Sequence, residues 1–291
     1  MLRMSIKFCE LYRADPYVTS FHMDQEYVYL LAGNSIVKLS IASHKTIHER
    51  ILFQNEGKSR SLLVDGSFIY VKDFCDLHIL KKDTLAPVEK LILGTDLSSD
   101  INTLGLDENY LYLSIRNGTM AKIDLKSHFE QDVFAVSDSS IWDFALHGER
   151  IYAGNVDGTL LVLDKVRMEV VNKIKASQQN LKSILVTDEL LFTASQDKKL
   201  VIRDTHTMEI INVTGNAHKK AFNLIGICGS LVYTICYAAG EIKAWEYPGL
   251  TLKGIIGFPG GFGQASIQDK RLYLASRNIK GLVYADLQVS Q

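Results

Sequence analysis

The sequence predicts an all-β protein built from seven copies of one short unit, and three observations support this. An apolar–aromatic–apolar triplet recurs along the 291 residues. Its copies are evenly spaced, 40 to 42 residues apart. No stretch keeps the i, i+3, i+4, i+7 apolar pattern of an amphipathic helix. The aromatic residues at the centres of the triplets are Tyr29, Tyr70, Tyr112, Tyr152, Phe192, Tyr233 and Tyr273.

The copy between Glu149 and Lys175 shows the unit most clearly, with the triplet strand followed by the turn Asp157-Gly158. Asp-Gly supplies the positive φ that a two-residue hairpin needs. A third strand then ends in an acidic residue, Asp164 in this copy. Each triplet strand is also preceded by an apolar strand and a polar turn, and a more polar strand ends the unit. The sequence therefore predicts four antiparallel strands per unit.

Seven such units without helical crossovers predict a seven-bladed β-propeller of four-stranded antiparallel blades, forming a single domain over residues 1–291. Each blade buries its faces against its neighbours, so the ring must close to be stable. The seventh unit has only three strands before the sequence ends at Gln291. We therefore expect residues 1–12 to form the outer strand of the last blade and so close it.

Composition argues against several functional classes. There are 32 basic and 33 acidic residues, which disfavours binding to nucleic acid or a membrane surface by bulk charge. The four cysteines form no C-x-x-C pair, and the histidines form no zinc-ligand spacing, so we expect neither a metal nor a cofactor. The first residues lack the apolar region of a signal peptide, and a cytoplasmic location is expected.

The sixth copy contains Ala217-His218, Thr234 and Trp245-Glu246. This pattern resembles WD40 repeats, which carry a Gly-His pair, a Ser/Thr, a turn Asp and a Trp-Asp, although Gly240 stands where the Asp is expected. The fifth copy has Ser195, Asp197 and Arg203-Asp204 but no His. Single copies also resemble quinoprotein-type propeller repeats. For His218 the resemblance implies a structural hydrogen bond, and the other interpretation is a ligand or base.

Residues that enter the first strands should share one face of a propeller, and the loop from Gly257 to Gln264 should lie on the same face. Aromatic and arginine side chains often contribute much of the binding energy at interfaces. Trp142 is the preferred residue, although a Trp buried between blades is an equally good interpretation. The candidate partner-binding face is Tyr17, Arg60, Trp142, Lys182, Phe222, Phe258 and Phe262, and Asn102 enters its strand at the same point.

No G-x-S-x-G or other catalytic pattern appears in the sequence. We therefore predict a non-catalytic scaffold that binds protein or peptide partners, as the WD40 resemblance also implies. The alternative is a propeller enzyme of the lyase, lactonase or quinoprotein kind with a site at the channel mouth. A third interpretation is a subunit of a fixed assembly, which would expose a large apolar patch.

Overall fold

The computed structural model describes residues 7–14, 17–54, 60–95, 97–127, 129–261 and 263–287. These residues form seven four-stranded antiparallel sheets, which confirms the predicted all-β fold with seven blades. Within the described ranges the only helical turn is the 3-10 helix η1 (Leu97–Ser99). The chain divides into two compact units, one of residues 1–95, 240–242 and 255–291 and one of residues 96–239 and 243–254. The predicted single domain stays a prediction.

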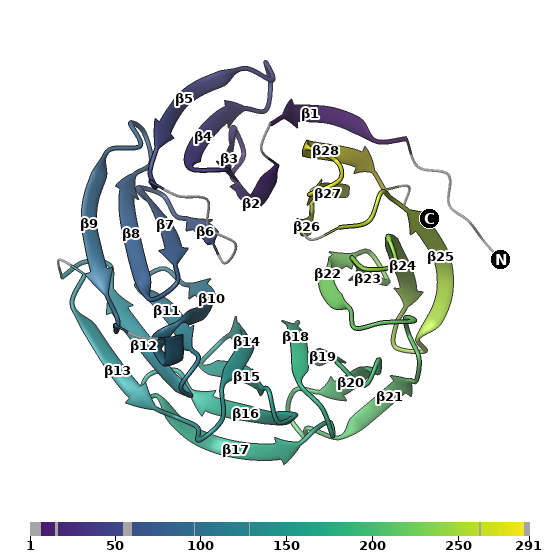
Figure 1. Ribbon diagram of the computed structural model, residues 1–291. Coiled ribbons are helices and arrows are strands. Elements are labelled where there is room, and N and C mark those ends of the chain that lie inside the picture. Colours follow the sequence, from purple (N-terminus) through teal and green to yellow (C-terminus); the bar gives the residue numbers. More distant parts are fainter. Residues whose placement is uncertain are drawn as a thin grey trace. The chain divides into compact units, whose positions relative to one another are not determined.

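The first unit contains blades 1, 2 and 7 (Figure 1). The strands of blade 1 are β2 (Val18–Met23), β3 (Tyr27–Ala32), β4 (Ser35–Ser40) and β5 (Thr46–Ile51). Those of blade 2 are β6 (Ser61–Val64), β7 (Phe68–Asp73), β8 (Asp76–Lys81) and β9 (Pro87–Ile92). Blade 7 consists of β26 (Gly263–Gln268), β27 (Arg271–Ser276), β28 (Gly281–Asp286) and β1 (Cys9–Arg13).

The second unit contains blades 3, 4 and 5 and most of blade 6. Blade 3 is β10 (Ile101–Leu106), β11 (Tyr110–Ile115), β12 (Thr119–Asp124) and β13 (Gln131–Ala135), and blade 4 is β14 (Ile141–His147), β15 (Arg150–Asn155), β16 (Thr159–Asp164) and β17 (Glu169–Lys175). Blade 5 is β18 (Leu181–Val186), β19 (Leu190–Ser195), β20 (Leu200–Asp204) and β21 (Ile210–Thr214). Blade 6 is β22 (Asn223–Cys228), β23 (Leu231–Cys236), β24 (Glu241–Glu246) and β25 (Thr251–Gly257).

The N-terminal strand lies at the outer edge of the last blade. Strand β1 pairs antiparallel with β28, with Cys9 opposite Tyr284 and Arg13 opposite Gly281 (Figure 1). This confirms that an N-terminal strand completes blade 7. The strand runs from Cys9 to Arg13 rather than over residues 1–12, and residues 1–6 of the predicted range lie outside the described residues.

The turns that shape the blades are built by aspartates and glycines. Asp107 Oδ1 accepts the backbone N–H groups of Asn109 and Tyr110, both at 2.9 Å, and so fixes the turn between β10 and β11. In the turn between β15 and β16, Gly158 has φ 87°, and a Cβ there would collide with the carbonyl oxygen of Ser177. The sequence therefore needs glycine at that position both for its conformation and for space.

The core lies between consecutive blades. One cluster in the second unit joins Tyr112 of blade 3 to Ile141 and Phe144 of blade 4. A cluster in the first unit joins Tyr29 of blade 1 to Leu62 of blade 2 in the same way. The aromatic residues of all seven triplets are buried, whereas the outer strand β5 is exposed along its whole length. The triplets thus pack blade against blade, as their even spacing predicts.

Candidate functional site

A bulge recurs near the start of the first strand in three consecutive blades. The register between β14 and β15 shifts between Ile141 and Asp143, which leaves Trp142 without a partner on the opposite strand. The same shift occurs around Asn102 in β10 and around Lys182 in β18. Because a bulge turns its extra residue out of the regular pleat, these three side chains occupy one structural position in blades 3, 4 and 5.

Trp142 and Lys182 are brought into contact at this position. The Lys182 ammonium nitrogen lies 3.7 Å from the centre of the Trp142 ring, a cation–π arrangement. Trp142 is 39% exposed, so it is not a space-filling residue buried between blades. Burial lowers the pKa of Lys182, because one face of the ammonium group is covered by the indole rather than by water. The pair forms an exposed aromatic surface with a positive charge above it.

Hydrogen bonds between neighbouring blades hold the Trp142 backbone in place. Thr103 Oγ1 in blade 3 donates to the Trp142 carbonyl oxygen at 3.1 Å. The Asp143 carboxylate accepts the backbone N–H of Ile184 in blade 5 at 2.9 Å. Burial raises the pKa of Asp143 to about 6, against the opposing effect of hydrogen bonds from backbone N–H groups such as that of Ile184. Thr103 Oγ1 also lies 3.4 Å from Asp143 Oδ1, so Asp143 of blade 4 contacts both blade 3 and blade 5, a role that sequence reasoning missed.

Four of the predicted face residues belong to the first unit, and two of them, Tyr17 and Phe258, are partly exposed. Tyr17 is half-buried, with the Arg277 guanidinium 5.5 Å from its ring centre. Phe258 is also half-buried, and its backbone N–H donates to Gly240 O at 2.9 Å. Phe262 lies outside the described residues. The candidate face in this unit therefore rests on Tyr17 and Phe258.

Arg60, the fourth predicted face residue of the first unit, is 8% exposed. Its Nε donates to Asp73 Oδ1 at 2.8 Å, and its guanidinium carbon lies 3.5 Å from the centre of the Phe53 ring. With its charge paired and its plane stacked on an aromatic ring, the side chain is held within blade 2. Arg60 is therefore better described as a structural residue than as a surface contact.

Phe222 does not lie on an exposed surface, which corrects its place in the candidate face. It is 1% exposed and belongs to the core cluster of blades 5 and 6. Its ring centre lies 4.9 Å from that of His218. Phe222 directly precedes its strand rather than occupying a bulge, and its apolar side chain packs into that core cluster.

A hydrogen-bond network joins the WD40-like residues of blade 6. His218 Nε2 lies 2.8 Å from Thr234 Oγ1, and Trp245 Nε1 donates to the same hydroxyl at 2.9 Å. Burial, with a smaller contribution from the charge of Lys243, lowers the pKa of His218 to about 3. A buried, neutral imidazole bonded to a strand hydroxyl fits the structural role that the repeat resemblance implies.

Sequence reasoning missed two counterparts of His218. Ser137 Oγ accepts from Asn155 Nδ2 at 2.7 Å in blade 4, and Ser177 Oγ donates to Asp197 Oδ2 at 3.1 Å in blade 5. Ser137, Ser177 and His218 are separated by about one repeat length. That spacing could have identified the two serines as equivalents of His218, but serine is too common a residue for the spacing alone to single them out.

In the part of the chain that the structure describes, no group of three or more His, Cys, Asp or Glu side chains is arranged to hold a metal ion. Among the same residues, no helix has the length and apolar character needed to span a membrane. The expected cytoplasmic location stays a prediction.

Comparison with solved structures identifies the fold. A chain in the crystal structure of the Mitotic Checkpoint Complex matches 99% of this chain and 94% of its own length, with a TM-score of 0.81 and 14% sequence identity. The computationally designed Ika8 protein matches 96% of this chain and 99% of its own, with a TM-score of 0.71 and 14% identity. Both comparisons, like the seven four-stranded sheets, show the fold of a seven-bladed β-propeller.

Similarity in sequence covers a smaller part of the chain than similarity in structure. No protein-family model matches this chain. Shk1 kinase-binding protein 15 of Schizosaccharomyces pombe is 31% identical over 102 residues, which are 35% of this chain. The match spans only 29% of that protein's length. The fold is thus shared over almost the whole chain, whereas the recognisable sequence similarity covers about a third of it.

Proposed function

We propose that this WD40-like propeller is a non-catalytic protein-binding platform whose binding face is centred on Trp142 and Lys182. The observation that carries the proposal is the exposed indole stacked under an ammonium group, on a bulge fixed by three neighbouring blades. A rigid, partly exposed Trp gives a large contact area at a low cost in conformational entropy, as binding hot spots require.

Similarity to a binding protein supports the proposal. Shk1 kinase-binding protein 15 is named as a protein that binds a kinase, and its matching segment is 31% identical to this chain. The partner of this chain is a protein or peptide in the proposal, and its identity is left to experiment. Because the Lys182 charge lies directly above the indole, the partner group at this point should be acidic or aromatic.

Affinity capture from native lysate tests the proposal with three forms of the protein. The wild type is compared with Trp142→Ala/Lys182→Ala and with Val166→Ala, a control that shortens a 65% exposed apolar side chain in the same unit. We expect a set of proteins that the wild type and Val166→Ala recover and that the double variant loses. Each protein in that set is then expressed and measured for direct binding to the three forms.

Two results would count against the proposal. If the double variant recovers the same proteins as the wild type, the binding face lies elsewhere. If the wild type captures nothing above background but converts a small molecule in a metabolite screen, the enzyme alternative replaces the platform.

A further inference from the structure

Blades 3 and 4 are joined by an ion pair that is partly buried. Lys165 Nζ of blade 4 lies 3.0 Å from Asp107 Oδ2 of blade 3. The Tyr112 hydroxyl donates to the same carboxylate oxygen at 3.3 Å. Lys122 Nζ lies 4.1 Å from the ring centre of the neighbouring Tyr110. At this junction the buried tyrosine hydroxyl therefore has an acidic partner within the protein.

The junction of blades 1 and 2 repeats the arrangement. Lys82 Nζ lies 2.9 Å from Asp24 Oδ2, to which the Tyr29 hydroxyl donates at 3.2 Å. Lys38 Nζ lies 4.2 Å from the ring centre of Tyr27. Two junctions in separate units thus share an Asp–Tyr–Lys arrangement, which makes a departure from it at another junction informative.

The junction of blades 4 and 5 keeps the tyrosine and loses its partners. Tyr152 of blade 4 is the structural equivalent of Tyr112 of blade 3. Each pairs with the same position of its blade's third strand: Tyr152 with Val162, and Tyr112 with Lys122. The other positions of the arrangement differ. His147 replaces Asp107 and Arg150 replaces Tyr110, while Val162 replaces Lys122 and Thr205 replaces Lys165. An acid, an aromatic ring and two ammonium groups are replaced, and neither the Asp nor the Lys of the ion pair remains.

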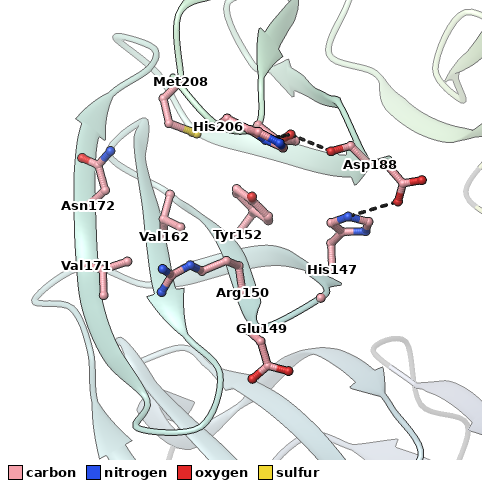
Figure 2. Close-up of a pocket in the computed structure, with 12 residues that line it drawn as sticks. His147, Glu149, Arg150, Tyr152, Val162, Val171, Asn172, Asp188, His206 and Met208 are labelled. Carbon is pink, nitrogen blue, oxygen red and sulfur yellow. Dashed lines mark hydrogen bonds and ion pairs between the residues drawn. The ribbon is translucent and has the colours of Figure 1, made fainter.

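A cavity of about 440 Å³ lies at this junction, with Tyr152 at its centre (Figure 2). Tyr152 is 3% exposed, and among the described residues its hydroxyl makes no hydrogen bond. Burial raises the pKa of this hydroxyl, and the nearby charge of Arg150 partly opposes the rise. Tyr152 lines the cavity, so its hydroxyl is available there as a hydrogen-bond donor to a ligand.

Nitrogen donors surround the Tyr152 hydroxyl. The Arg150 guanidinium, the His147 ring and the His206 ring line the same cavity from three sides of the tyrosine (Figure 2). Arg150 is only loosely engaged, since its Nη1 lies 3.5 Å from Asp164 Oδ2. Neither nearby acidic side chain occupies the space beside the Tyr152 hydroxyl. Asp188 is exposed and lies 3.4 Å from His147 Nε2, and the Glu149 side chain points away from Tyr152 (Figure 2).

We propose that this cavity binds an oxyanion, the carboxylate or phosphate group of a ligand, through Arg150 and Tyr152 with His147 and His206 at its sides. A guanidinium presents two parallel N–H donors that match the oxygens of either group, and a tyrosine hydroxyl adds a third donor. Val162 and Met208 give the site an apolar wall. This site is independent of the Trp142 face and stands whether or not that face binds a protein.

Blade 7 and blade 1 provide a matched control site of about 420 Å³. Arg271 and Tyr273 occupy the positions of Arg150 and Tyr152 there. Arg271, however, donates through Nε to Asp286 Oδ1 at 2.8 Å and lies 5.3 Å from the Tyr284 ring centre. That guanidinium is already engaged within the protein, so its removal should leave the oxyanion site unaffected.

The test follows the NMR signals of the His147 and His206 rings, assigned with His147→Gln and His206→Gln. Inorganic phosphate and sodium acetate are titrated separately at constant pH, with sodium chloride holding the ionic strength. We expect saturable shifts of both rings. Arg150→Gln should weaken binding at least about tenfold and Tyr152→Phe about threefold, the loss of a charged and a neutral hydrogen bond respectively. Arg271→Gln should change the dissociation constant of the anion by less than about twofold.

The relative affinities identify the natural group. Tighter binding of phosphate assigns the site to a phosphorylated ligand, and tighter binding of acetate assigns it to a carboxylate. The proposal is overturned if neither anion shifts the rings more than chloride does. It is also overturned if Arg150→Gln binds as tightly as Arg271→Gln.

Discussion

Lys165 Nζ lies 3.0 Å from Asp107 Oδ2, and this contact joins blade 4 to blade 3. Both side chains are mostly shielded from water. Burial alone would raise the pKa of Asp107, but hydrogen bonds from the Asn109 N–H and from Lys165 hold the pKa below its usual value. The ion pair therefore differs from an exposed surface pair, whose contribution to stability is small.

Lys165→Met should destabilise the protein, because it leaves Asp107 partly buried with one fewer partner. We expect the free energy of unfolding to fall by about 1–3 kcal/mol, measured by urea denaturation. Lys253→Met is the matched control, since Lys253 pairs with Glu246 at 2.7 Å on the exposed surface of the same unit. The control should change stability by less than about 0.5 kcal/mol. Equal effects of the two substitutions would contradict the role given to the Lys165 pair.

Thr234→Val removes the hydroxyl shared by His218 and Trp245 while keeping the shape of the side chain. Two buried N–H or ring nitrogen groups then lose a partner, which should cost about 1–3 kcal/mol of unfolding free energy. Thr193→Val is the control, because Thr193 is buried at the matching point of β19 and its hydroxyl makes no side-chain hydrogen bond within the described residues. A similar cost at both positions would show that the network adds nothing to stability.

His218 should make the protein sensitive to acid. Its folded pKa of about 3 lies below the usual value, so the unfolded chain takes up a proton between about pH 6.5 and 3 while the folded protein does not. Stability is lost as the pH falls through that range. Between pH 7.5 and 5.0 the loss should be roughly 2 kcal/mol larger in the wild type than in His218→Asn. If the free energy of unfolding of the two proteins fell equally with pH, the role given to His218 would be refuted.

Asp143 should make the protein more stable as the pH falls, the opposite of the effect of His218. Its folded pKa of about 6 lies above the unfolded value, so its contribution to stability grows as the pH falls from about 7 to 4. Asp143→Asn keeps an oxygen that can accept the Ile184 N–H and removes the buried charge. At pH 7 we expect the variant to be more stable by roughly 1–3 kcal/mol, a gain that disappears near pH 4. A less stable variant at pH 7 would mean that the ionised carboxylate is a net stabiliser.

Strand β1 should contribute substantially to the stability of blade 7. Deleting residues 1–13 removes the pairing with β28 and exposes the core around the buried Leu11. We expect a lower thermal midpoint and a loss of several kcal/mol, a large part of a typical protein's stability. Ile51→Ala, at an exposed position of the outer strand β5, is the control and should leave the midpoint nearly unchanged. An unchanged midpoint after the deletion would refute the role of β1.

The repeat spacing and the residues of the turns were enough to predict the fold. Tyr152 and Asp157-Gly158 mark a strand and a hairpin whose side-chain and backbone requirements are local, so they can be recognised in the sequence. The same locality predicted a structural role for His218, because its partners belong to one repeat. The N-terminal strand was also predictable, since the last unit lacked one strand, although its bounds shifted to Cys9–Arg13.

The candidate sites depend on contacts between different repeats. Trp142 and Lys182 are 40 residues apart in the sequence, and only the packing of blade 4 against blade 5 places the ammonium over the indole. Packing also decided that Phe222 is buried. The sequence by itself thus determined the unit and its repetition, because these follow from local backbone preferences and hydrophobic periodicity. Only the tertiary structure decided which side chains meet between blades, because those distances depend on how whole sheets pack.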